Sequence, residues 1–462
     1  MKLGWLVGDK EFYRRTLLVA VPIMIQNGIT NFVNLLDNIM VGRIGTEQMS
    51  GVAITNQLMF VFHLSIFGAI SGAGIFTAQF YGKGDREGIR YTMRFKWIIS
   101  LVIVAIALGL FFGFGEELIM SYLQGSSDVG DVAQTLQYGQ QYLTLIMLEM
   151  LPFAVVQIYA STMRETGETM LPMMAGIAAV AVNLLGNYLL IFGKFGCPRL
   201  GVRGAAVATI LSRFVECAIV ILWTHMNKKK APYAVGLYRG FRIPRQLTLQ
   251  IVVKGTPLLI NEFLWAGGMA VLAQCYSLRG LSVVAALNIC NTISNVFNVV
   301  LIAMGSAISI IVGQLLGAGR VEEAKDTDSR LIAFSVELCI VVGALMALVS
   351  PLFPRIYDTQ DMVRNLATEL ICVTALCMPI QAFVNAAYFT LRSGGKTIIT
   401  FIFDSAFVWA VAIPLAYCLS RFTGLPIVQL YLAVQLVDIV KCVIGFVFVK
   451  KGIWIHNIVD SP

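Results

Sequence analysis

The amino-acid sequence predicts an all-α polytopic membrane protein with twelve transmembrane helices in two pseudo-symmetric six-helix lobes. Its 462 residues are 58% hydrophobic and only 13% charged, and the mean hydropathy is +0.78. Soluble domains carry about 25% charged residues, so this composition excludes an ordinary soluble fold. Apolar runs long enough to cross a bilayer recur along the whole chain, and the two halves share motifs in one register.

Each predicted span holds roughly the 20 apolar residues that a membrane-crossing helix needs. In chain order the spans cover approximately residues 14–41, 50–80, 93–113, 132–160, 170–192, 204–226, 247–275, 283–316, 329–350, 363–390, 397–419 and 427–449. Several exceed the thickness of a bilayer, which predicts tilt or bending. The expected bend points are Pro22, Pro152 and Pro257, because an interior proline removes a backbone hydrogen bond.

The basic residues predict the orientation of the chain. The formal net charge is +8. Most lysines and arginines fall on one side of the membrane if the N-terminus lies inside. This distribution predicts a multi-pass protein of the plasma (inner) membrane with both termini cytoplasmic. Nucleic-acid binding is not predicted, because no basic stripe lies on a polar domain.

The longest polar interruption is NKKKAPYAVGLYRGFRIPR, at residues 227–245, and it divides the spans six and six. We therefore predict an N-lobe at residues 1–226, a basic cytoplasmic linker at 227–245 and a C-lobe at 246–462.

The two halves repeat one another. The segment QFYGKGDRE (79–87) is echoed by QLLGAGRVE (314–322), and MRETGET (163–169) is echoed by LRSGGKT (391–397). Because six helices separate the repeats, both halves insert the same way up. Parallel repeats of this kind favour a two-bundle transporter with a central cavity.

The cysteines and histidines form no reactive or metal-binding pattern. The nine cysteines are scattered singly, mostly in apolar runs, where cysteine behaves as a small hydrophobe. His63, His225 and His456 are far apart and carry no HExxH pattern. We therefore predict that the protein is not an enzyme and uses no cofactor.

Several motifs resemble those of the multidrug and toxic compound extrusion (MATE) family. They are LLDNIMVGRIG (35–45), AQFYGKGD (78–85), MRETGETMLPM (163–173), VNLLGNYLLIFG (182–193) and GCPRLGVRGAAVAT (196–209), with QLLGAGR and LRSGGKT in the second half. The resemblance covers nearly the whole chain. It implies two six-helix lobes that form a V around a cavity.

The resemblance also implies an antiporter that exports amphipathic, often cationic compounds in exchange for Na+ or H+. The expected partners are then small amphipathic organic substrates and membrane lipids, without nucleic acid, and the transporter is expected to be a monomer. Related flippases and polysaccharide exporters share the broad fold. Export of a lipid-linked or polysaccharide precursor therefore stays the alternative.

Asp37 places a carboxylate near the end of the first apolar run, roughly 13 Å from the midplane at 1.5 Å per residue. A charge at membrane depth costs at least ~2.5–3.5 kcal/mol, so it needs a partner, a cavity or a function. Apolar neighbours such as Leu35 and Ile39 favour enclosure over hydration at the outer interface, and the repeat places Leu272 at the equivalent position. The resemblance implies that Asp37 is a coupling residue, as a Na+ ligand or a proton carrier.

Asn183 and Asn187 are four residues apart, so they share one face of the span 170–192. Three roles are open for these amides. They can complete an oxygen shell for Na+ with Asp37, form a hydrogen-bond network that tunes the pKa of Asp37, or only join helices. In part of the family an aspartate stands at the position of Asn187. We therefore predict one negative charge in this lobe instead of two, and both Na+ and H+ stay open.

Glu262 lies close to the middle of the span 247–275, five residues after Pro257. It is expected to face the cavity as a counter-charge for a cationic substrate or as a second protonatable group, unless it pairs with a polar neighbouring helix. Many members of the family carry this glutamate about one turn later. Trp265 shares its face and can stack on an aromatic or cationic compound.

Two amide stripes are further candidates for substrate binding. Gln381 and Asn385 mark one face of the span 363–390, and Asn288 and Asn291 mark one face of the span 283–316. Each stripe lines the cavity or joins helices. In one branch of the family an aspartate stands near the position of Gln381.

The remaining intramembrane acids are expected to be mainly structural. Asp438 and Lys441 are three residues apart and are expected to neutralise one another. Asp404 stays open between a structural and a functional role. The other acids expected to be structural are Glu149, Glu216 and Glu337.

Overall fold

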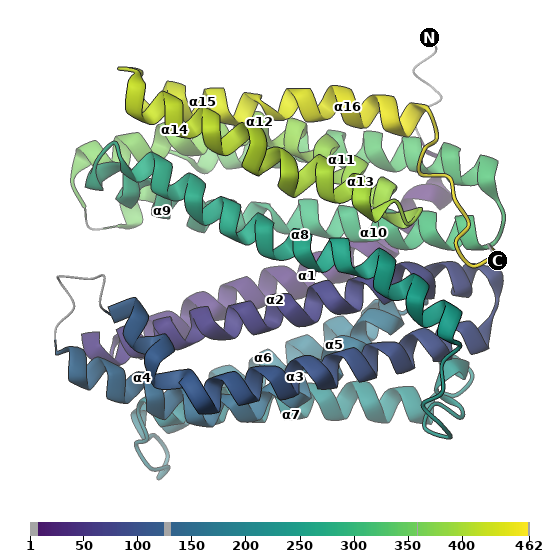
Figure 1. The fold of residues 1–462 in the computed structure, drawn as a ribbon. Helices are drawn as coiled ribbons and strands as arrows, with labels where there is room; N and C mark the ends of the chain where they lie inside the picture. The colour runs from purple at the N-terminus through teal and green to yellow at the C-terminus, as the bar shows by residue number, and fades with distance from the viewer. Residues whose placement is uncertain (1–7, 124–130, 358, 461–462) are drawn as a thin grey trace. The chain divides into compact units, whose positions relative to one another are not determined.

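The computed structural model describes residues 8–123, 131–357 and 359–460, and these residues form helices and connecting turns without a strand (Figure 1). Twelve helical spans within this part of the chain are long and apolar enough to cross a membrane. The predicted all-α membrane fold is therefore confirmed.

In the first half the elements are α1 (Lys10–Gly42), α2 (Thr46–Lys83), α3 (Arg86–Leu123), α4 (Val132–Ile146), η2 (Met147–Glu149), α5 (Met150–Glu165), α6 (Met170–Phe192), α7 (Val202–Met226) and η3 (Pro232–Ala234). In the second half they are α8 (Arg245–Ser277), α9 (Leu281–Phe297), α10 (Val299–Gly317), α11 (Val321–Val349), η4 (Phe353–Ile356), α12 (Asp361–Ser393), α13 (Thr397–Phe401), η5 (Ile402–Ala406), η6 (Val408–Ala412), α14 (Ile413–Phe422), α15 (Ile427–Leu436) and α16 (Asp438–Lys450).

The span predicted at 132–160 tightens into the 3-10 turn η2 between α4 and α5. Pro152 is the third residue after this turn and lacks the N–H that would bond to the carbonyl of Leu148, inside the turn. The break therefore falls where the interior proline predicted it.

The span predicted as one helix at 283–316 consists of two helices, α9 and α10, that meet at Asn298. The ψ angle of Asn298 is −15°, shallower than in an α-helix, although its N–H still bonds to the carbonyl of Ser294 at 2.8 Å. Just before the break, the hydroxyl of Ser294 donates to the carbonyl of Cys290 at 2.7 Å. Such a back-bond competes with the helical ladder, and hydropathy does not register it.

The last third of the chain contains a π-helical stretch, η5 and η6, that the sequence did not predict. Asn261 of α8 is responsible for its position. Its Oδ1 accepts from the backbone N–H of Ser405 at 3.3 Å, and its own carbonyl accepts from the Ser405 hydroxyl at 2.9 Å. A side chain inserted into the backbone ladder displaces the normal i→i−4 bonds.

The helices form two compact units. Unit 1 comprises the described parts of Met1–Met24, Ala78–Asp85 and Gln250–Pro462, and unit 2 comprises Ile25–Thr77 and Arg86–Leu249. In unit 1, α12 packs against α9, α10, α11, α15 and α16, and in unit 2, α7 packs against α4, α5 and α6. The predicted lobe boundaries at 226 and 246 stay a prediction.

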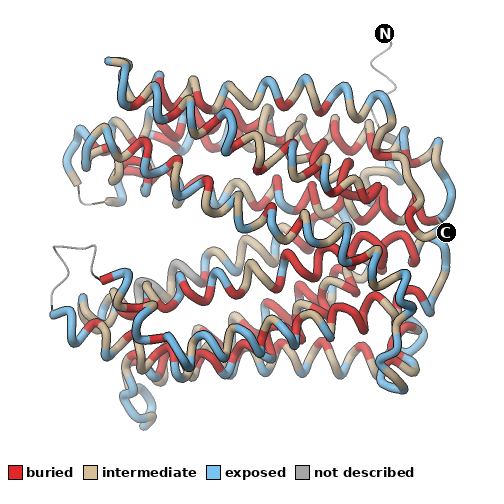
Figure 2. The backbone as a smooth tube through the Cα atoms, in the orientation of Figure 1, coloured by how far each residue is buried: buried red, intermediate tan, exposed pale blue. Residues whose placement is uncertain are grey.

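The spans of each unit differ in how far they are buried (Figure 2). The α4–α5 span and α10 are mostly buried, whereas the middle of α3 is mostly exposed and apolar. In a membrane protein an exposed apolar surface of this kind faces lipid. The predicted linker is fastened to unit 2, because Arg94 of α3 donates to the carbonyls of Leu237 and Gly236 at 2.9 and 3.0 Å.

Within unit 1 the two copies of the repeated glutamine–glycine motif cross each other. Gly82 at the end of α2 lies against the backbone of Gln314, and Gly317 at the end of α10 lies against the backbone of Gln79. A side chain at either glycine would occupy the space of the opposing main chain.

Gly317→Ala should lower the free energy of unfolding by about 1–3 kcal/mol, because the added methyl meets backbone that cannot rotate away. Thermal unfolding of the purified protein measures the change. Gly109→Ala in α3 is the matched control: nothing lies within 4 Å of the position, and alanine favours the helix there by about 0.5–1 kcal/mol. Equal midpoints for the two variants would contradict the close crossing.

Gln79 of the same motif also binds the C-terminal segment. Its Nε2 donates to the carbonyls of Ser393 and His456 at 3.0 and 3.2 Å, and its Oε1 accepts from the N–H of Ile458 at 2.9 Å. The Gln79 side chain is fully buried. Both amide hydrogens and one of the two oxygen lone pairs of Gln79 are thus bonded to backbone groups.

Candidate functional site

The carboxylate of Asp37 on α1 meets two amides of α6 inside unit 2. Asn187 Nδ2 donates to Asp37 Oδ1 at 2.6 Å. Asn183 lies one turn earlier, where its amide nitrogen can donate to both Asp37 oxygens at 2.9 and 3.1 Å while its oxygen accepts from the Thr209 hydroxyl at 3.2 Å. The structure therefore brings together the three residues predicted as the cation-coupling site. The side chains of Leu35 and Ile39, expected to enclose Asp37, lie outside the described part of the chain.

A glycine explains how α6 and α7 come close enough to build this site. Gly186 lies between the two asparagines on α6, and a Cβ there would press on the Cβ of Ala208 on α7 at 2.8 Å. The small pair lets the two backbones approach. Thr209, the next residue on α7, thereby reaches Asn183. The sequence pattern did not single out Thr209, although it closes the GCPRLGVRGAAVAT motif.

The chemistry of this site suits a proton or a monovalent cation. The site offers one carboxylate, together with amide and hydroxyl oxygens, and the Asn187 oxygen is buried without a partner among the described residues. Hard cations take oxygen ligands of this kind. In the described ranges, no three His, Cys, Asp or Glu side chains gather as a metal cluster.

Arg213 on α7 organises a second polar cluster in unit 2. Its Nη1 donates to Glu216 Oε2 at 2.9 Å, and its Nε lies 3.5 Å from Glu149 Oε2. His63 Nε2 lies 3.3 Å from the other oxygen of Glu149, and its ring stacks on Phe153 with centroids 4.0 Å apart. Both acids are buried. Their pairing explains how two intramembrane carboxylates are accommodated.

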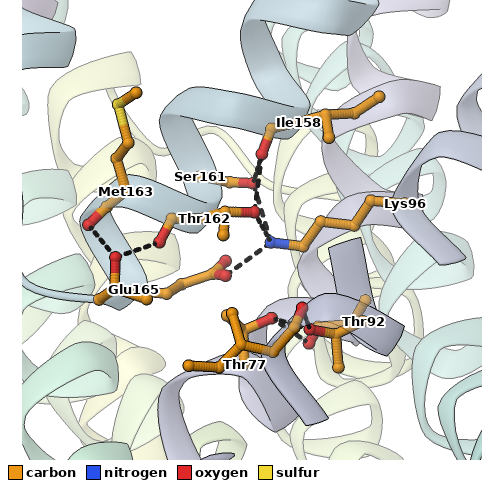
Figure 3. A network of polar contacts seen from close by, with 11 residues as sticks. Thr77, Thr92, Lys96, Ile158, Ser161, Thr162, Met163 and Glu165 are labelled. Carbon is orange, nitrogen blue, oxygen red and sulfur yellow. Dashed lines mark hydrogen bonds and ion pairs between the residues drawn. The ribbon is translucent and has the colours of Figure 1, made fainter. Parts of the chain in front are cut away.

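A buried ion pair joins α3 to α5 (Figure 3). The ammonium of Lys96 is fully buried and uses three acceptors: Glu165 Oε2 at 2.6 Å, Ser161 Oγ at 3.0 Å and Thr162 Oγ1 at 3.2 Å. Lys96 lies inside α3, which begins at Arg86, seven residues before the start of the predicted span 93–113.

The six predicted substrate-binding residues lie on three helices of unit 1. Glu262 is half-buried on α8, and Trp265 one turn later is 42% exposed. Asn288 and Asn291 are exposed on α9. On α12, Gln381 donates to Gln435 at 2.9 Å, and Asn385 lies against Gly305 of α10. Among the described residues, no hydrogen bond or ion pair joins any two of the six, so their common role stays a prediction.

Asn261, next to Glu262, connects a polar cluster that the sequence did not reveal. Its Nδ2 donates to Asp404 at 3.1 Å and lies 3.3 Å from the Tyr388 hydroxyl. Lys441 Nζ lies 3.7 Å from Asp404 and 3.6 Å from Asp438. The expected neutralisation of Asp438 by Lys441 is therefore observed, and Asp404 shares the same ammonium.

Arg392 lies two residues beyond the predicted span 363–390, yet it belongs to the last turn of α12 and is buried. The internal repeat indicates this helical position, because it aligns Arg392 with Arg164, another arginine at the end of a helix. Arg164 in turn donates to Gln26 at 3.3 Å within unit 2.

The fold and this site define a polytopic, all-helical membrane transporter with a carboxylate–amide site in its first span. A model of the MatE family matches residues 22–189 and again residues 257–418, so it covers most of both halves. The chain belongs to the MatE family. Members of this family are transporters and not enzymes, which confirms the corresponding prediction.

Curated relatives and solved structures are similar over nearly the whole chain. The probable multidrug resistance protein NorM of Thermotoga maritima is 24% identical over 457 residues, covering 96% of this chain and 93% of the relative. Multidrug resistance protein PmpM of Pseudomonas aeruginosa is 25% identical over 408 residues, covering 88% and 84%. An outward-facing multidrug resistance MATE family transporter of the MOP superfamily shares the fold with a TM-score of 0.86 and 18% identity, covering 98% of each chain.

Proposed function

We propose that this chain is a cation-coupled antiporter that exports small amphipathic organic compounds, many of them cations, by alternating access. The multidrug resistance names of its relatives support this substrate class. In this proposal the protein works as a monomer in the plasma (inner) membrane with both termini cytoplasmic. Residues 1–226 and 246–462 act as two lobes joined by the basic linker at 227–245.

The observation that carries the proposal is the hydrogen bond from Asn187 to Asp37. A carboxylate within the membrane is costly unless it is neutralised, and here its partners are neutral amides. Binding a proton or Na+ removes the net charge and changes what the Asp37 oxygens can accept. The amides of α6 then lose or regain a partner on α1, which couples occupancy to the packing of these helices.

The substrate side of the proposal is Glu262 with Trp265 on α8. Glu262 is half-buried and supplies a carboxylate, and the exposed Trp265 ring offers a stacking surface one turn away. Asn288, Asn291, Gln381 and Asn385 add amide groups that bind substrate in the same proposal.

No contact among the described residues favours the flippase alternative. A site for a lipid-linked phosphate would need arginine or lysine free to bind the anion. Lys441 is buried between Asp404 and Asp438, and Arg392 is buried with its guanidinium 5.3 Å from the centroid of the Phe389 ring.

Transport in proteoliposomes tests the function. The purified protein is reconstituted with a fluorescent organic cation, and a Na+ gradient and a pH gradient are imposed in separate experiments. We expect one of the gradients to drive the cation against its own gradient. Absence of uphill movement with both gradients, in vesicles that hold correctly folded protein, would refute coupled export.

Glu262→Gln should weaken export of cations about tenfold and leave export of neutral compounds unchanged. The amide keeps the size of the side chain but removes the counter-charge. Initial rates for matched cationic and neutral substrates measure the effect, with exposed Glu369→Gln on α12 as the control. Equal losses for both substrate types would argue that Glu262 shapes the cavity and does not recognise charge.

A further inference from the structure

An apolar groove of about 270 Å³ lies between α8 and α13 on the surface of unit 1. Its residues on α8 recur at helical spacing and form one stripe, and two residues one turn apart on α13 line its other side. The lining residues are Val253, Thr256, Pro257, Ile260, Ile398 and Phe401. The hydroxyl of Thr256 donates to the carbonyl of Val252 at 2.8 Å, so the single polar side chain of the lining is satisfied within its own helix. Val253, Ile260 and Ile398 are exposed, and such a surface in a membrane protein meets lipid chains.

Two lysines lie at one end of this groove. Lys254 follows Val253 on α8, and Lys396 stands two residues before Ile398. The Lys254 ammonium donates to the carbonyl of Gly395 at 3.1 Å, which brings it to the turn that carries Lys396. Both lysines are half-buried, and neither forms an ion pair with a carboxylate among the described residues. The end of the groove therefore carries two positive charges that no acid of the described chain balances.

The internal repeat shows that the repeated fold does not require this basic pair. The register of QFYGKGDRE with QLLGAGRVE places Val19 at the position equivalent to Lys254. The register of MRETGET with LRSGGKT places Glu168 at the position equivalent to Lys396. One apolar and one acidic residue thus occupy these positions in the first half, and the basic pair belongs to the second half alone.

We propose that this groove binds one anionic phospholipid, with the phosphate on Lys254 and Lys396 and the first part of an acyl chain along the apolar stripe. Basic pockets between membrane helices on the cytoplasmic side suit anionic headgroups. From Lys254 to Ile260 the stripe runs about 9 Å along α8, which leads the chain from the headgroup into the membrane. In the proposed orientation the two lysines lie toward the cytoplasmic leaflet.

The lipid groove is separate from the proposed substrate site. Glu262 comes nine residues after Val253, which is about two and a half turns, so it lies on the opposite face of α8. The phospholipid is therefore a ligand of the outer surface of unit 1 and not a transported compound. Its phosphate ties α8 to the turn between α12 and α13, in addition to the bond from Lys254 to Gly395.

Lipid binding to the purified full-length protein in detergent tests this proposal. Native mass spectrometry compares dioleoylphosphatidylglycerol, which is anionic, with dioleoylphosphatidylcholine, which is zwitterionic and has the same acyl chains. We expect the wild type to prefer the anionic lipid, and we expect Lys254→Met and Lys396→Met each to lower this preference about fivefold. Lys228→Met combined with Lys229→Met removes two exposed lysines of the linker and should leave the preference unchanged.

Two further measurements test the groove itself and the source of the phosphate. Thr256→Trp keeps both lysines but fills the groove, so it should weaken the binding of both lipids about tenfold. Inorganic phosphate in excess should not displace dioleoylphosphatidylglycerol, because it has no acyl chain to occupy the groove.

A preference that falls in the two lysine variants and persists in the linker variant supports the proposal. Equal binding of the two lipids by the wild type, or an unchanged preference in Lys396→Met, overturns it. Lys396→Met leaves the bond from Lys254 to Gly395 intact, so it serves as the test if Lys254→Met does not fold. Displacement by inorganic phosphate, or full binding to Thr256→Trp, overturns the docking of a lipid chain. None of these outcomes bears on cation export, because binding is measured without an ion gradient.

Discussion

Asp37→Asn is expected to abolish ion-driven export while the protein stays folded. An asparagine cannot carry a proton and does not attract a cation. Two opposite charges about 4 Å apart at an effective dielectric constant of about 20 attract by about 4 kcal/mol, so the change removes roughly 1,000-fold in cation affinity. The fold should survive, because Asn187 can still donate to the remaining oxygen at position 37.

Counterflow and gradient-driven transport in proteoliposomes measure this loss, with thermal unfolding as the check on the fold. Glu117→Gln, an exposed acid of α3, removes the same charge elsewhere and should transport like the wild type. Gradient-driven export by Asp37→Asn at the wild-type rate would refute the assignment of Asp37 as the coupling residue.

Lys96→Met is expected to cause the largest loss of stability of any single substitution considered. The methionine leaves the Glu165 carboxylate inside unit 2 without the ammonium that lies 2.6 Å from it. Breaking one partner of a buried pair costs about 3–5 kcal/mol, several times more than losing a surface pair. Chemical or thermal unfolding in detergent should show a correspondingly lower midpoint.

A double variant separates lost attraction from lost packing. Lys96→Met combined with Glu165→Gln removes both charges, so most of the lost stability should return. If the double variant were as unstable as the single one, packing and the bonds to Ser161 and Thr162 would be the stabilising contribution instead.

Hydropathy predicted the spans because the bilayer imposes a simple requirement of length and apolarity. It failed where a single side chain alters the backbone. Ser294 precedes the break at Asn298, and Asn261 shapes the π-helical stretch, each through a hydrogen bond that an apolar average does not contain. Pro152 was predictable because a missing N–H is visible in the residue itself.

The grouping of Asp37 with Asn183 and Asn187 was predictable for a different reason. Polar groups in an apolar helix must find partners, and spacing of four residues puts two amides on one face. The burial of Lys96 and Arg392 was not predictable, because basic residues near helix ends normally lie in the inner aqueous region. Their burial depends on acceptors from distant segments, such as Glu165 for Lys96, and these pairings are set by tertiary structure.

The crossing of Gly82 and Gly317 has a consequence for the origin of the chain. Each glycine faces the backbone of the glutamine that begins the other copy of the motif, so the contact is self-complementary. A polypeptide with only one copy would be able to make the same contact with a second molecule of itself, as in an isologous dimer. Duplication and fusion of such a gene would convert an intermolecular interface into an intramolecular one, and would free the two copies to diverge at every position except those that touch.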